Sequence, residues 1–412
     1  MKELTRDSRL LFISRTARLF GYGFLSVVLV LYLTQLGLDE GQVGLLLTLT
    51  LIGDTAISLW ITTHADRLGR KRMLIAGAGL MILAGILFVT TSNYFLLVLA
   101  ATFGVISPSG KEVGPFLSIE QAALSHLLPD NQRTGIFAWY NLVGSFATAL
   151  GALCGGGLSQ LLNSTGMPAL EAYRTVVMGY AFIGLLLVII FLRLSPEVEN
   201  LPRTEAVDPV QVRDSTFLGL GRSRGIVLRL AALFSIDAFA GGFVIQSLVA
   251  YWFHVRFGVE PGVLGTIFFG ANILAGISAL SAAWVARRIG LIRTMVFTHL
   301  PSNVLLILVP LMPNLPLAIT VFLLRFSISQ MDVPTRQSYT MAMVEPDERS
   351  AAAGVTGVSR TVGASLAPIF TGILFSNPAL LSLPFIISGS LKIVYDLILY
   401  RSFQAHRPPE ER

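Results

Sequence analysis

The pattern of apolar and polar positions divides the chain into long apolar stretches separated by short polar segments. Each stretch is about 20 residues long or longer, the length that an α-helix needs to cross the hydrocarbon core of a bilayer. The pattern therefore predicts an all-α membrane protein with twelve transmembrane helices. We expect these helices at residues 10–36, 43–63, 73–92, 94–127, 134–162, 173–193, 226–255, 262–285, 294–312, 316–343, 351–376 and 381–403.

One polar connection, residues 194–225, is much longer than the others. It holds three prolines among mixed charges, which is typical of a linker between folded parts. We therefore expect an N-terminal six-helix half at 1–193, a cytoplasmic linker at 194–225 and a C-terminal six-helix half at 226–412.

The two halves repeat each other at an offset of 219 residues. The matching positions are Gly23 and Gly242, Tyr32 and Tyr251, Pro115 and Pro334, and Gly144 and Gly363. Over the second helix the offset is 221, where Gly44 matches Gly265 and Gly69 matches Gly290. A nearly constant offset over several helices predicts two pseudo-symmetric halves, an arrangement known among transporters, where the site lies between the halves near the midplane. At the offset of 219, Arg18 corresponds to Asp237, and Asn141 corresponds to Arg360.

Lysine and arginine collect in alternate connections. If the N-terminus is cytoplasmic, the inner connections and tails carry 21 of these residues and the outer connections carry 2, which are Arg174 and Arg256. Cytoplasmic segments of membrane proteins have such a positive bias, so we expect both termini to be cytoplasmic. The same bias explains the net charge of +6 without a nucleic-acid partner.

The composition excludes an ordinary soluble domain. Hydrophobic residues make up 53% of the chain and charged residues 13%, whereas soluble domains carry roughly 25% charged residues. The single cysteine, Cys154, cannot form an internal disulfide, and the first apolar run is long enough to be a span rather than a cleaved signal peptide. We expect a multi-pass protein of a bacterial inner (plasma) membrane.

The connection between the second and third predicted helices carries a short motif. Its sequence, Thr62-Thr-His-Ala-Asp-Arg-Leu-Gly-Arg-Lys-Arg72, resembles the signature G-x-x-x-D-R-x-G-R-[RK] of the major facilitator superfamily. The matching residues are Asp66, Arg67, Gly69, Arg70 and Lys71, while Thr62 replaces the first glycine. The resemblance implies a gate: in the family this loop helps to hold the cytoplasmic side closed, with the aspartate facing the positive N-terminal end of the eleventh helix.

The resemblance also implies which helices matter for transport. In this family, helices 1, 4, 7 and 10 line the central cavity, with helices 2, 5, 8 and 11 beside them. The predicted helix 351–376 carries Gly354, Gly363 and Pro368, which partly resemble a glycine and proline motif of the family's antiporters. The antiporters carry that motif in helix 5. The partial match favours export over uptake, and the alternative is close helix packing through small residues.

Ionisable residues inside the predicted spans are the candidates for the substrate or proton pathway, because charges in the membrane are costly and usually functional. The candidates are Arg18, Asp54, Lys111, Glu112, Asp237, Arg325, Asp332 and Arg360. Each could instead belong to a structural ion pair between helices. Within this set, we favour Asp237 and Glu112 as proton sites.

Other charged residues near the span ends have simpler interpretations. We expect Arg15, Glu120 and Arg336 to extend to the inner interface rather than to lie inside the protein. Lys392 and Asp396 are four residues apart on one predicted helix, as are Asp332 and Arg336, and this spacing predicts local pairs.

The fourth predicted helix contains the segment Ser107-Pro-Ser-Gly-Lys-Glu-Val-Gly-Pro115. Two prolines and two glycines weaken a helix, and backbone outside a helix is tolerated at membrane depth where it lines a cavity or is buried in protein. The segment predicts either a cavity wall with unbonded carbonyls beside Lys111 and Glu112, or a kinked packing helix.

These features predict a secondary transporter that moves a small organic molecule by alternating access, with protons as the coupling ion and efflux as the direction. The alternatives are uptake or facilitated transport of an anionic metabolite, and a non-transporting membrane sensor on the same scaffold. No motif for an enzyme, a metal or another cofactor is present in the sequence. We expect a monomer in contact with lipid, small-molecule substrate and protons, and no nucleic-acid partner.

Overall fold

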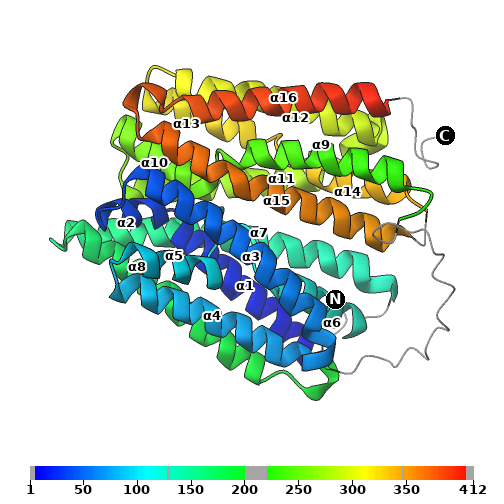
Figure 1. The fold of residues 1–412 in the computed structure, drawn as a ribbon, viewed down its shortest axis with the longest axis horizontal. Helices are drawn as coiled ribbons and strands as arrows, with labels where there is room; N and C mark the ends of the chain where they lie inside the picture. The colour runs from blue at the N-terminus through cyan, green and yellow to red at the C-terminus, as the bar shows by residue number, and fades with distance from the viewer. Residues whose placement is uncertain (1–4, 128–129, 200–219, 346–347, 405–412) are drawn as a thin grey trace. The chain divides into compact units, whose positions relative to one another are not determined.

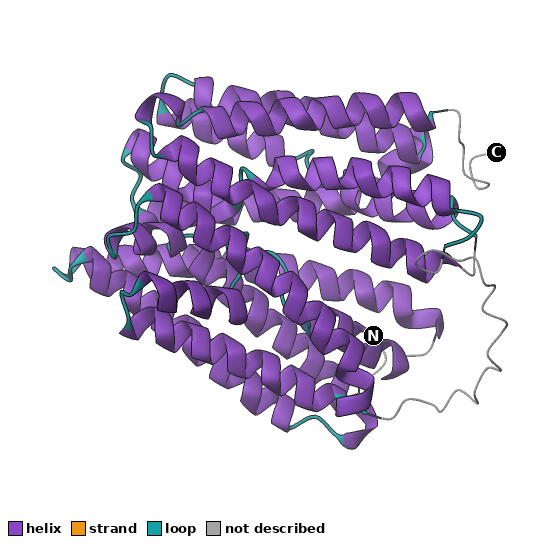
Figure 2. Ribbon diagram, in the orientation of Figure 1, coloured by secondary structure: helices purple, strands orange, loops and turns teal. Residues whose placement is uncertain are grey.

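The computed structural model describes residues 5–127, 130–199, 220–345 and 348–404, and in these ranges the chain is helical with no β-strand (Figure 2). The chain divides into two compact units. The first unit comprises Met1–Ala206 and Ile245–Phe269, and the second comprises Val207–Val244 and Gly270–Arg412. Figure 1 labels the helices of both units.

The first unit packs around its first helix, α1. Its elements are α1 (Arg6–Ser26), α2 (Leu29–Gln35), α3 (Glu40–Leu68), α4 (Arg70–Thr90), α5 (Tyr94–Phe103), α6 (Phe116–Leu127), α7 (Asp130–Ser164), α8 (Ala169–Leu192), the short 3-10 helix η1 (Pro196–Val198) and α10 (Gln246–Phe257). Helix α1 packs against α7 and α8, α4 packs against α8, and α3 packs against α5. Helix α11 (Pro261–Ile289) begins in the first unit and continues into the second.

The second unit packs around its own first helix, α9. Its further elements are α9 (Arg224–Gly242), α12 (Leu291–Leu308) with the 3-10 helix η2 (Val309–Leu311), α13 (Leu315–Phe326), α14 (Asp332–Ala342), α15 (Arg349–Phe375), the 3-10 helix η4 (Pro378–Leu380) and α16 (Leu383–Phe403). Helix α9 packs against α15 and α16, and α12 packs against α16 and α14. In each unit, two later helices therefore pack on the first helix.

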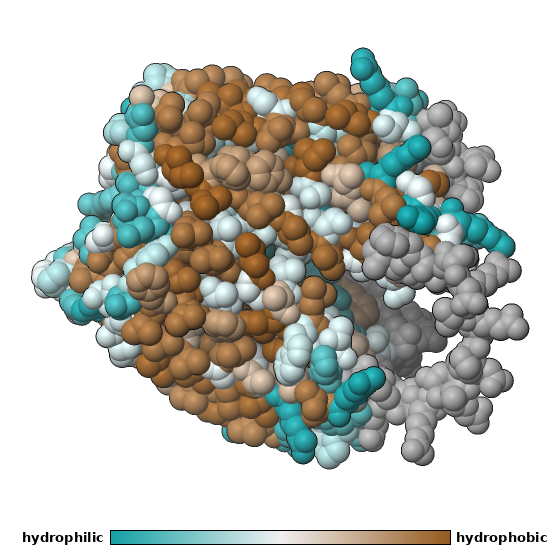
Figure 3. Space-filling view, viewed as in Figure 1, coloured by the Kyte–Doolittle hydropathy of each residue, from teal (hydrophilic) through white to brown (hydrophobic). Residues whose placement is uncertain are grey.

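The helices match a membrane protein in length and surface. Within the described residues, nine helices are long and apolar enough to cross a membrane, or ten if the bent pair α1 and α2 counts as one span. Large apolar side chains face outward, such as Phe95 at 77% exposed, Phe182 at 69% and Ile373 at 58%. Figure 3 shows such side chains over much of the visible face of the helices. The shorter apolar helices α5 and α13 are further candidates, and the twelve-span count remains a prediction.

Four predicted helices are broken where the sequence predicted single helices. The predicted ranges 10–36, 94–127, 226–255 and 316–343 are interrupted at 27–28, 104–115, 243–245 and 327–331, respectively. The first of these breaks bends the chain by 44°. The affected helices are the first and fourth of each predicted half, so the breaks follow the internal repeat.

Proline explains two of these breaks. Proline has no N–H group and clashes with the preceding helical turn, so it is best tolerated in the first turn of a helix. Pro115 directly precedes α6, and Pro334 lies in the first turn of α14. These two prolines are repeat equivalents, and a continuous helix through either of them would lose a backbone hydrogen bond.

Glycine allows α1 and α7 to approach closely. A Cβ atom added to Gly151 of α7 would lie 2.0 Å from the carbonyl oxygen of Phe20, and one added to Gly155 would lie 2.1 Å from the carbonyl oxygen of Phe24. These are backbone atoms that cannot rotate away. Small residues at such crossings let membrane helices pack at short distance.

We predict that Gly151→Ala destabilises the protein by about 1–3 kcal/mol, because the added methyl group overpacks the contact with α1. Gly157, on the same helix, has no neighbour of this kind within 4 Å and is the matched control. Gly157→Ala should be neutral or stabilising by up to about 1 kcal/mol, because alanine favours the helix. Thermal unfolding of both purified variants in detergent measures the difference, and equal stabilities would contradict the prediction.

Candidate functional site

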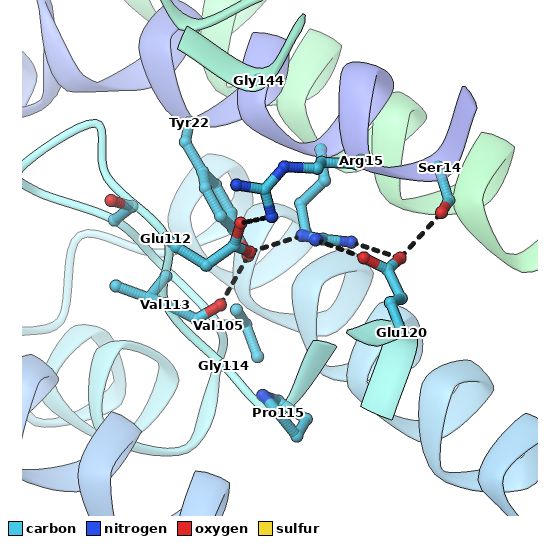
Figure 4. Close-up of polar contacts among 12 residues, drawn as sticks. Ser14, Arg15, Tyr22, Val105, Glu112, Val113, Gly114, Pro115, Glu120 and Gly144 are labelled. Atoms are coloured by element: carbon cyan, nitrogen blue, oxygen red, sulfur yellow. Dashed lines mark hydrogen bonds and ion pairs between the residues drawn. The ribbon is translucent and has the colours of Figure 1, made fainter. Parts of the chain in front are cut away.

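A buried cluster of four charges lies in the first unit (Figure 4). Helix α1 contributes Arg15 and Arg18, the broken segment 104–115 contributes Glu112, and α6 contributes Glu120. Arg15 Nη1 lies 2.9 Å from Glu112 Oε2, and Arg18 Nε lies 2.8 Å from Glu112 Oε1. Arg18 also binds both oxygens of Glu120, each at 2.7 Å. The two guanidinium groups and the two carboxylates balance one another.

Neighbouring polar groups form hydrogen bonds with the remaining polar atoms of these four side chains. Ser14 and Tyr140 donate hydrogen bonds to Glu120 at 2.7 and 2.5 Å. Arg15 donates to the carbonyl oxygen of Tyr140 at 2.9 Å and to Asn141 Oδ1 at 3.1 Å. Such complete pairing is what a buried ion cluster needs in order to offset the cost of removing its charges from water.

Two sequence interpretations are wrong here. Arg15 and Glu120 were expected to extend to the membrane interface, but both are buried and belong to this cluster, at 6% and 0% exposed. The physical reason is that Arg15 and Arg18 are three residues apart and share one face of α1. That face is turned toward α6 and the broken segment rather than toward the lipid.

Five carbonyl groups of segment 104–115 accept hydrogen bonds from side chains, so the interpretation of unbonded carbonyls is wrong for these five. The donors belong to the first unit: Tyr180 donates to Val105, Ser247 to Pro108, Thr148 to Gly110, Ser107 to Lys111, and Tyr22 to Val113. Backbone outside a helix thus has its partners inside the protein, as the membrane requires. The side chain of Lys111 is exposed.

Asp54 of α3 also contacts this segment. Its Oδ1 atom accepts a hydrogen bond from the backbone N–H of Gly114 at 2.6 Å. The structure thus brings Arg18, Asp54 and Glu112, three of the predicted pathway residues, around one broken span.

A second buried cluster lies in the second unit around Asp237 of α9. Lys392 Nζ lies 2.5 Å from Asp237 Oδ1. Arg336 Nη1 lies 3.2 Å and Arg360 Nη1 lies 3.3 Å from Asp237 Oδ2. Arg336 also lies 3.0 Å from Asp332, which confirms the predicted local pair. Asp237 therefore gathers cations from α14, α15 and α16.

The second cluster overturns further sequence interpretations. Arg336 is 5% exposed and does not extend to the interface. Lys392 and Asp396 do not pair with each other: Lys392 binds Asp237, while Asp396 binds His299 Nδ1 at 2.9 Å and Asn303 Nδ2 at 2.9 Å. Lys392 and Asp396 lie one turn apart on α16, but each has a closer partner on another helix, on α9 for Lys392 and on α12 for Asp396. Sequence reasoning missed His299 and Asn303, whose signal was a polar spacing of four residues inside an apolar span.

Arg325 and Arg360 differ from the other cations of the second unit. The side chain of Arg360 is 33% exposed although it pairs with Asp237. Arg325 has no ion pair among the described residues, and its buried Nε atom has no hydrogen-bond partner there. Its guanidinium lies 5.0 Å from the ring centre of Phe326. The structure therefore leaves Arg325 outside the Asp237 cluster.

The motif between α3 and α4 is built around a turn at Gly69. Gly69 has a φ of 100°, a conformation that favours glycine, and α4 begins at the next residue. The backbone N–H groups of Arg70 and Lys71 donate to the Glu199 carboxylate at 2.7 and 3.0 Å. Lys71 Nζ binds the carbonyl oxygens of Leu192 and Leu194 at 2.8 and 2.7 Å.

These contacts cap helix ends, because a carboxylate stabilises the N-terminus of α4 and an ammonium group stabilises the C-terminus of α8. The side chain of Arg67 is exposed. The Asp66 side chain lies outside the described part of the structure.

A similar carboxylate caps α9 in the second unit. Glu348 accepts hydrogen bonds from the backbone N–H groups of Gly221, Arg222 and Ser223 at 2.8, 2.9 and 2.9 Å. Burial raises the pKa of the Glu348 carboxyl, but these hydrogen bonds outweigh that effect and hold the pKa below its ordinary value of 4.5.

Comparison with known proteins identifies the family. The model of the Major Facilitator Superfamily matches residues 11–368. The chain belongs to the Major Facilitator Superfamily. This result confirms the resemblance that the motif Asp66 to Lys71 indicated.

Relatives of this facilitator occur in a yeast and in bacteria. An uncharacterized membrane protein of Saccharomyces cerevisiae is 36% identical over 419 residues, covering 96% of this chain and 93% of the yeast protein. A Na(+), Li(+), K(+)/H(+) antiporter of Planococcus maritimus is 29% identical over 28% of this chain and 27% of its own. The quinolone resistance protein NorA of Staphylococcus aureus is 26% identical over 34% of this chain and 35% of its own.

Solved structures of facilitators share the fold. A bacterial homologue of the human lysosomal transporter Spinster matches with a TM-score of 0.77 and 15% identity, covering 98% of this chain and 99% of the other. A D-xylose-proton symporter matches with a TM-score of 0.73 and 14% identity, covering 96% and 97% of the two chains. Family and fold together indicate a multi-pass membrane transporter and not an enzyme.

We predict that Arg18→Met destabilises this facilitator by about 3–5 kcal/mol, because it leaves Glu120 buried without a cation. Adding Glu120→Gln should recover part of that loss, since the unpaired charge is then removed. Arg9→Met, on an exposed position of the same helix, is the control. Thermal unfolding in detergent compares the three variants, and a single Arg18 variant as stable as the control would rule out the prediction.

We also predict a pH-dependent contribution from Glu348. Because its folded-state pKa lies below the unfolded value, the ionised carboxylate stabilises the fold above pH 4.5 and loses this effect as the pH falls through the folded-state pKa. Glu348→Gln should therefore lose less thermal stability than the wild type on acidification below pH 4.5. Glu345→Gln, with an exposed side chain, should behave like the wild type. Identical acid sensitivity in all three proteins would contradict the assignment.

Proposed function

We propose that this facilitator is a secondary active transporter that exports a small organic molecule by alternating access in exchange for protons. The observation that carries the proposal is the pair of buried ion clusters, one in each unit, beside the broken spans. Ionisable side chains at membrane depth are costly and usually mark substrate or proton pathways. The proposed pathway residues are Arg18, Asp54, Lys111, Glu112, Asp237, Arg325, Asp332 and Arg360.

The direction and the coupling ion draw support from partial relatives. An antiporter that exchanges Na(+), Li(+) or K(+) for H(+) and a quinolone resistance protein each align with about a third of this chain or less. The first name describes an exchange of cations for protons and the second describes drug resistance, each in the relative itself. By extension, these two activities favour proton-coupled efflux for this chain. The motif Asp66, Arg67, Gly69, Arg70 and Lys71 is proposed to act as the cytoplasmic gate. A bacterial plasma membrane remains the proposed location.

A second candidate function is uptake or facilitated transport of an anionic metabolite. It is favoured by the charges in the spans of the second unit, where Arg325, Arg336, Arg360 and Lys392 exceed the three aspartates Asp237, Asp332 and Asp396. Arg360 is partly exposed, and Arg325 forms no ion pair with the residues that the structure describes. Either side chain could bind a carboxylate or phosphate group, since arginine recognises both in bidentate fashion.

The decisive test uses purified protein in liposomes that contain a pH-sensitive dye. An imposed pH gradient is followed while single compounds are added: Na(+), K(+), a quinolone, a nucleoside, a pentose sugar and a dicarboxylate. We expect one class of compound to dissipate the gradient in proportion to the protein content, and a gradient to drive accumulation of that compound. Protein-free liposomes are the control.

The outcomes separate the candidates. Proton-coupled efflux predicts exchange of the compound for protons, whereas facilitated transport of an anion predicts movement without any dependence on the pH gradient. Saturable binding of a compound with no movement in either condition would contradict both and would favour a sensor.

A further inference from the structure

Asp54 is a buried carboxylate that has no cation beside it in the described part of the chain. It lies in α3, within the candidate span Glu40–Ala65, and is 8% exposed. Gly114 N donates to its Oδ1 atom at 2.6 Å, and Ser58 Oγ lies 3.5 Å from the same atom. Among the described residues, no lysine, arginine or histidine forms an ion pair with Asp54.

The other acids of the two clusters have cationic partners. The pairs are Glu112 with Arg15 and Arg18, Glu120 with Arg18, Asp237 with Lys392, Arg336 and Arg360, and Asp332 with Arg336. A neighbouring cation favours the ionised form of a carboxyl group, whereas burial without one favours the neutral form. Asp54 is therefore better suited to take up and release a proton than Asp237 or Glu112, which the sequence had favoured.

The hydrogen-bond donor to Asp54 belongs to the broken span. Gly114 has a φ of 80° and stands at the end of segment 104–115, between Val113 and Pro115. The Val113 carbonyl accepts a hydrogen bond from Tyr22 of α1 at 3.1 Å, so α1 and α3 fix the peptide group between Val113 and Gly114 from both sides. Pro115 has no N–H group. Asp54 thus holds the last amide donor before α6 begins.

Few other ionisable groups face Asp54. Those that interact with it electrostatically are Glu112 of the broken segment, Tyr22 of α1 and Tyr180 of α8. Among the helices that pack on α3, α2 and α5 have no charged residue, and α4 has its charged residues only at its start, Arg70 to Arg72, directly after the end of α3. Helix α6 directs Glu120 to Arg18. Two ionised carboxylates repel each other, so a proton on Asp54 would relieve its repulsion from Glu112 and leave the Arg18 cluster paired.

We propose that Asp54 is the proton-binding carboxylate of the transport cycle, and that its protonation releases segment 104–115 from α3. This inference rests on the proposed proton coupling. A proton from the aqueous phase adds to one carboxylate oxygen and leaves again by the same bond. The neutral group is a weaker acceptor for Gly114 N–H, because a hydrogen bond to an ionised carboxylate is about twice as strong as one to a neutral acceptor.

The test measures the proton and the backbone directly in the purified full-length protein, without any substrate. Infrared difference spectra across roughly pH 5 to 9, a range that covers documented buried carboxyls, should show a protonated carboxyl band that Asp54→Asn removes. Hydrogen exchange followed by mass spectrometry should show protection of segment 104–115 falling roughly tenfold as that group protonates. Asp54→Asn should exchange at the fast rate at every pH.

Ser58→Ala is the matched control, because it removes the neighbouring hydroxyl and keeps the carboxylate; its titration and its pH-dependent protection should persist. A carboxyl band that titrates unchanged in Asp54→Asn overturns the proposal. So does wild-type protection of 104–115 that is independent of pH after correction for intrinsic exchange. Wild-type protection that does not change with pH overturns the proposal even if Asp54→Asn fails to fold.

Liposome transport distinguishes this inference from the proposed function. Wild-type protein that shows no proton-coupled movement, while Asp54 titrates and releases the segment as described, would contradict the proposed function and leave the proton site standing. Proton-driven accumulation that survives in Asp54→Asn would contradict the role of Asp54 and leave the proposed function intact.

Discussion

The guanidinium group of Arg18 lies completely out of contact with solvent, and much of the first unit is arranged to satisfy it. Moving such a charge out of water costs several kcal/mol even after the protein relaxes. Two carboxylates offset this cost by pairing with Arg18: Glu120 of α6 and Glu112 of the non-helical segment 104–115. If segment 104–115 were a helix, helix geometry would dictate the position of Glu112 relative to α1. The backbone groups of the segment would then bond within the helix and would not need Asp54, Tyr22 or Tyr180 as partners.

The second unit applies the same constraint with the charges reversed. Asp237 occupies the repeat position of Arg18, and it gathers three cations where Arg18 gathers two acids. The neighbouring repeat pair also contacts a charge on the first helix of its unit: Asn141 of α7 binds Arg15 of α1, and Arg360 of α15 binds Asp237 of α9. The two units thus carry a buried charge at the same repeat position of their first helices, positive in Arg18 and negative in Asp237.

The sequence predicted the membrane class and the family well, because lipid demands long apolar helices and the motif Asp66 to Lys71 is specific. It predicted poorly which face of each helix turns inward. An arginine a few residues from the end of an apolar stretch fits both an interface and an interior position, so Arg15 and Arg336 were misassigned. The break at 327–331 contains no glycine or proline, and the signals for it in the sequence were Pro334, three residues later, and its repeat partner Pro115.

The broken span and the buried charges act on each other. A carbonyl that leaves the helical ladder inside a membrane costs several kcal/mol unless another donor binds it. Tyr22, Tyr180 and Ser247 provide such donors from α1, α8 and α10, so segment 104–115 cannot change its path without giving up partners on several helices. Glu112, two residues before Gly114, is fixed by Arg15 and Arg18 in the same way. A change of charge at this point therefore alters the contacts that hold the backbone, and a shift of the backbone alters the pairing of the charges. That mutual dependence is what a transporter needs in order to link an ion to a conformational change.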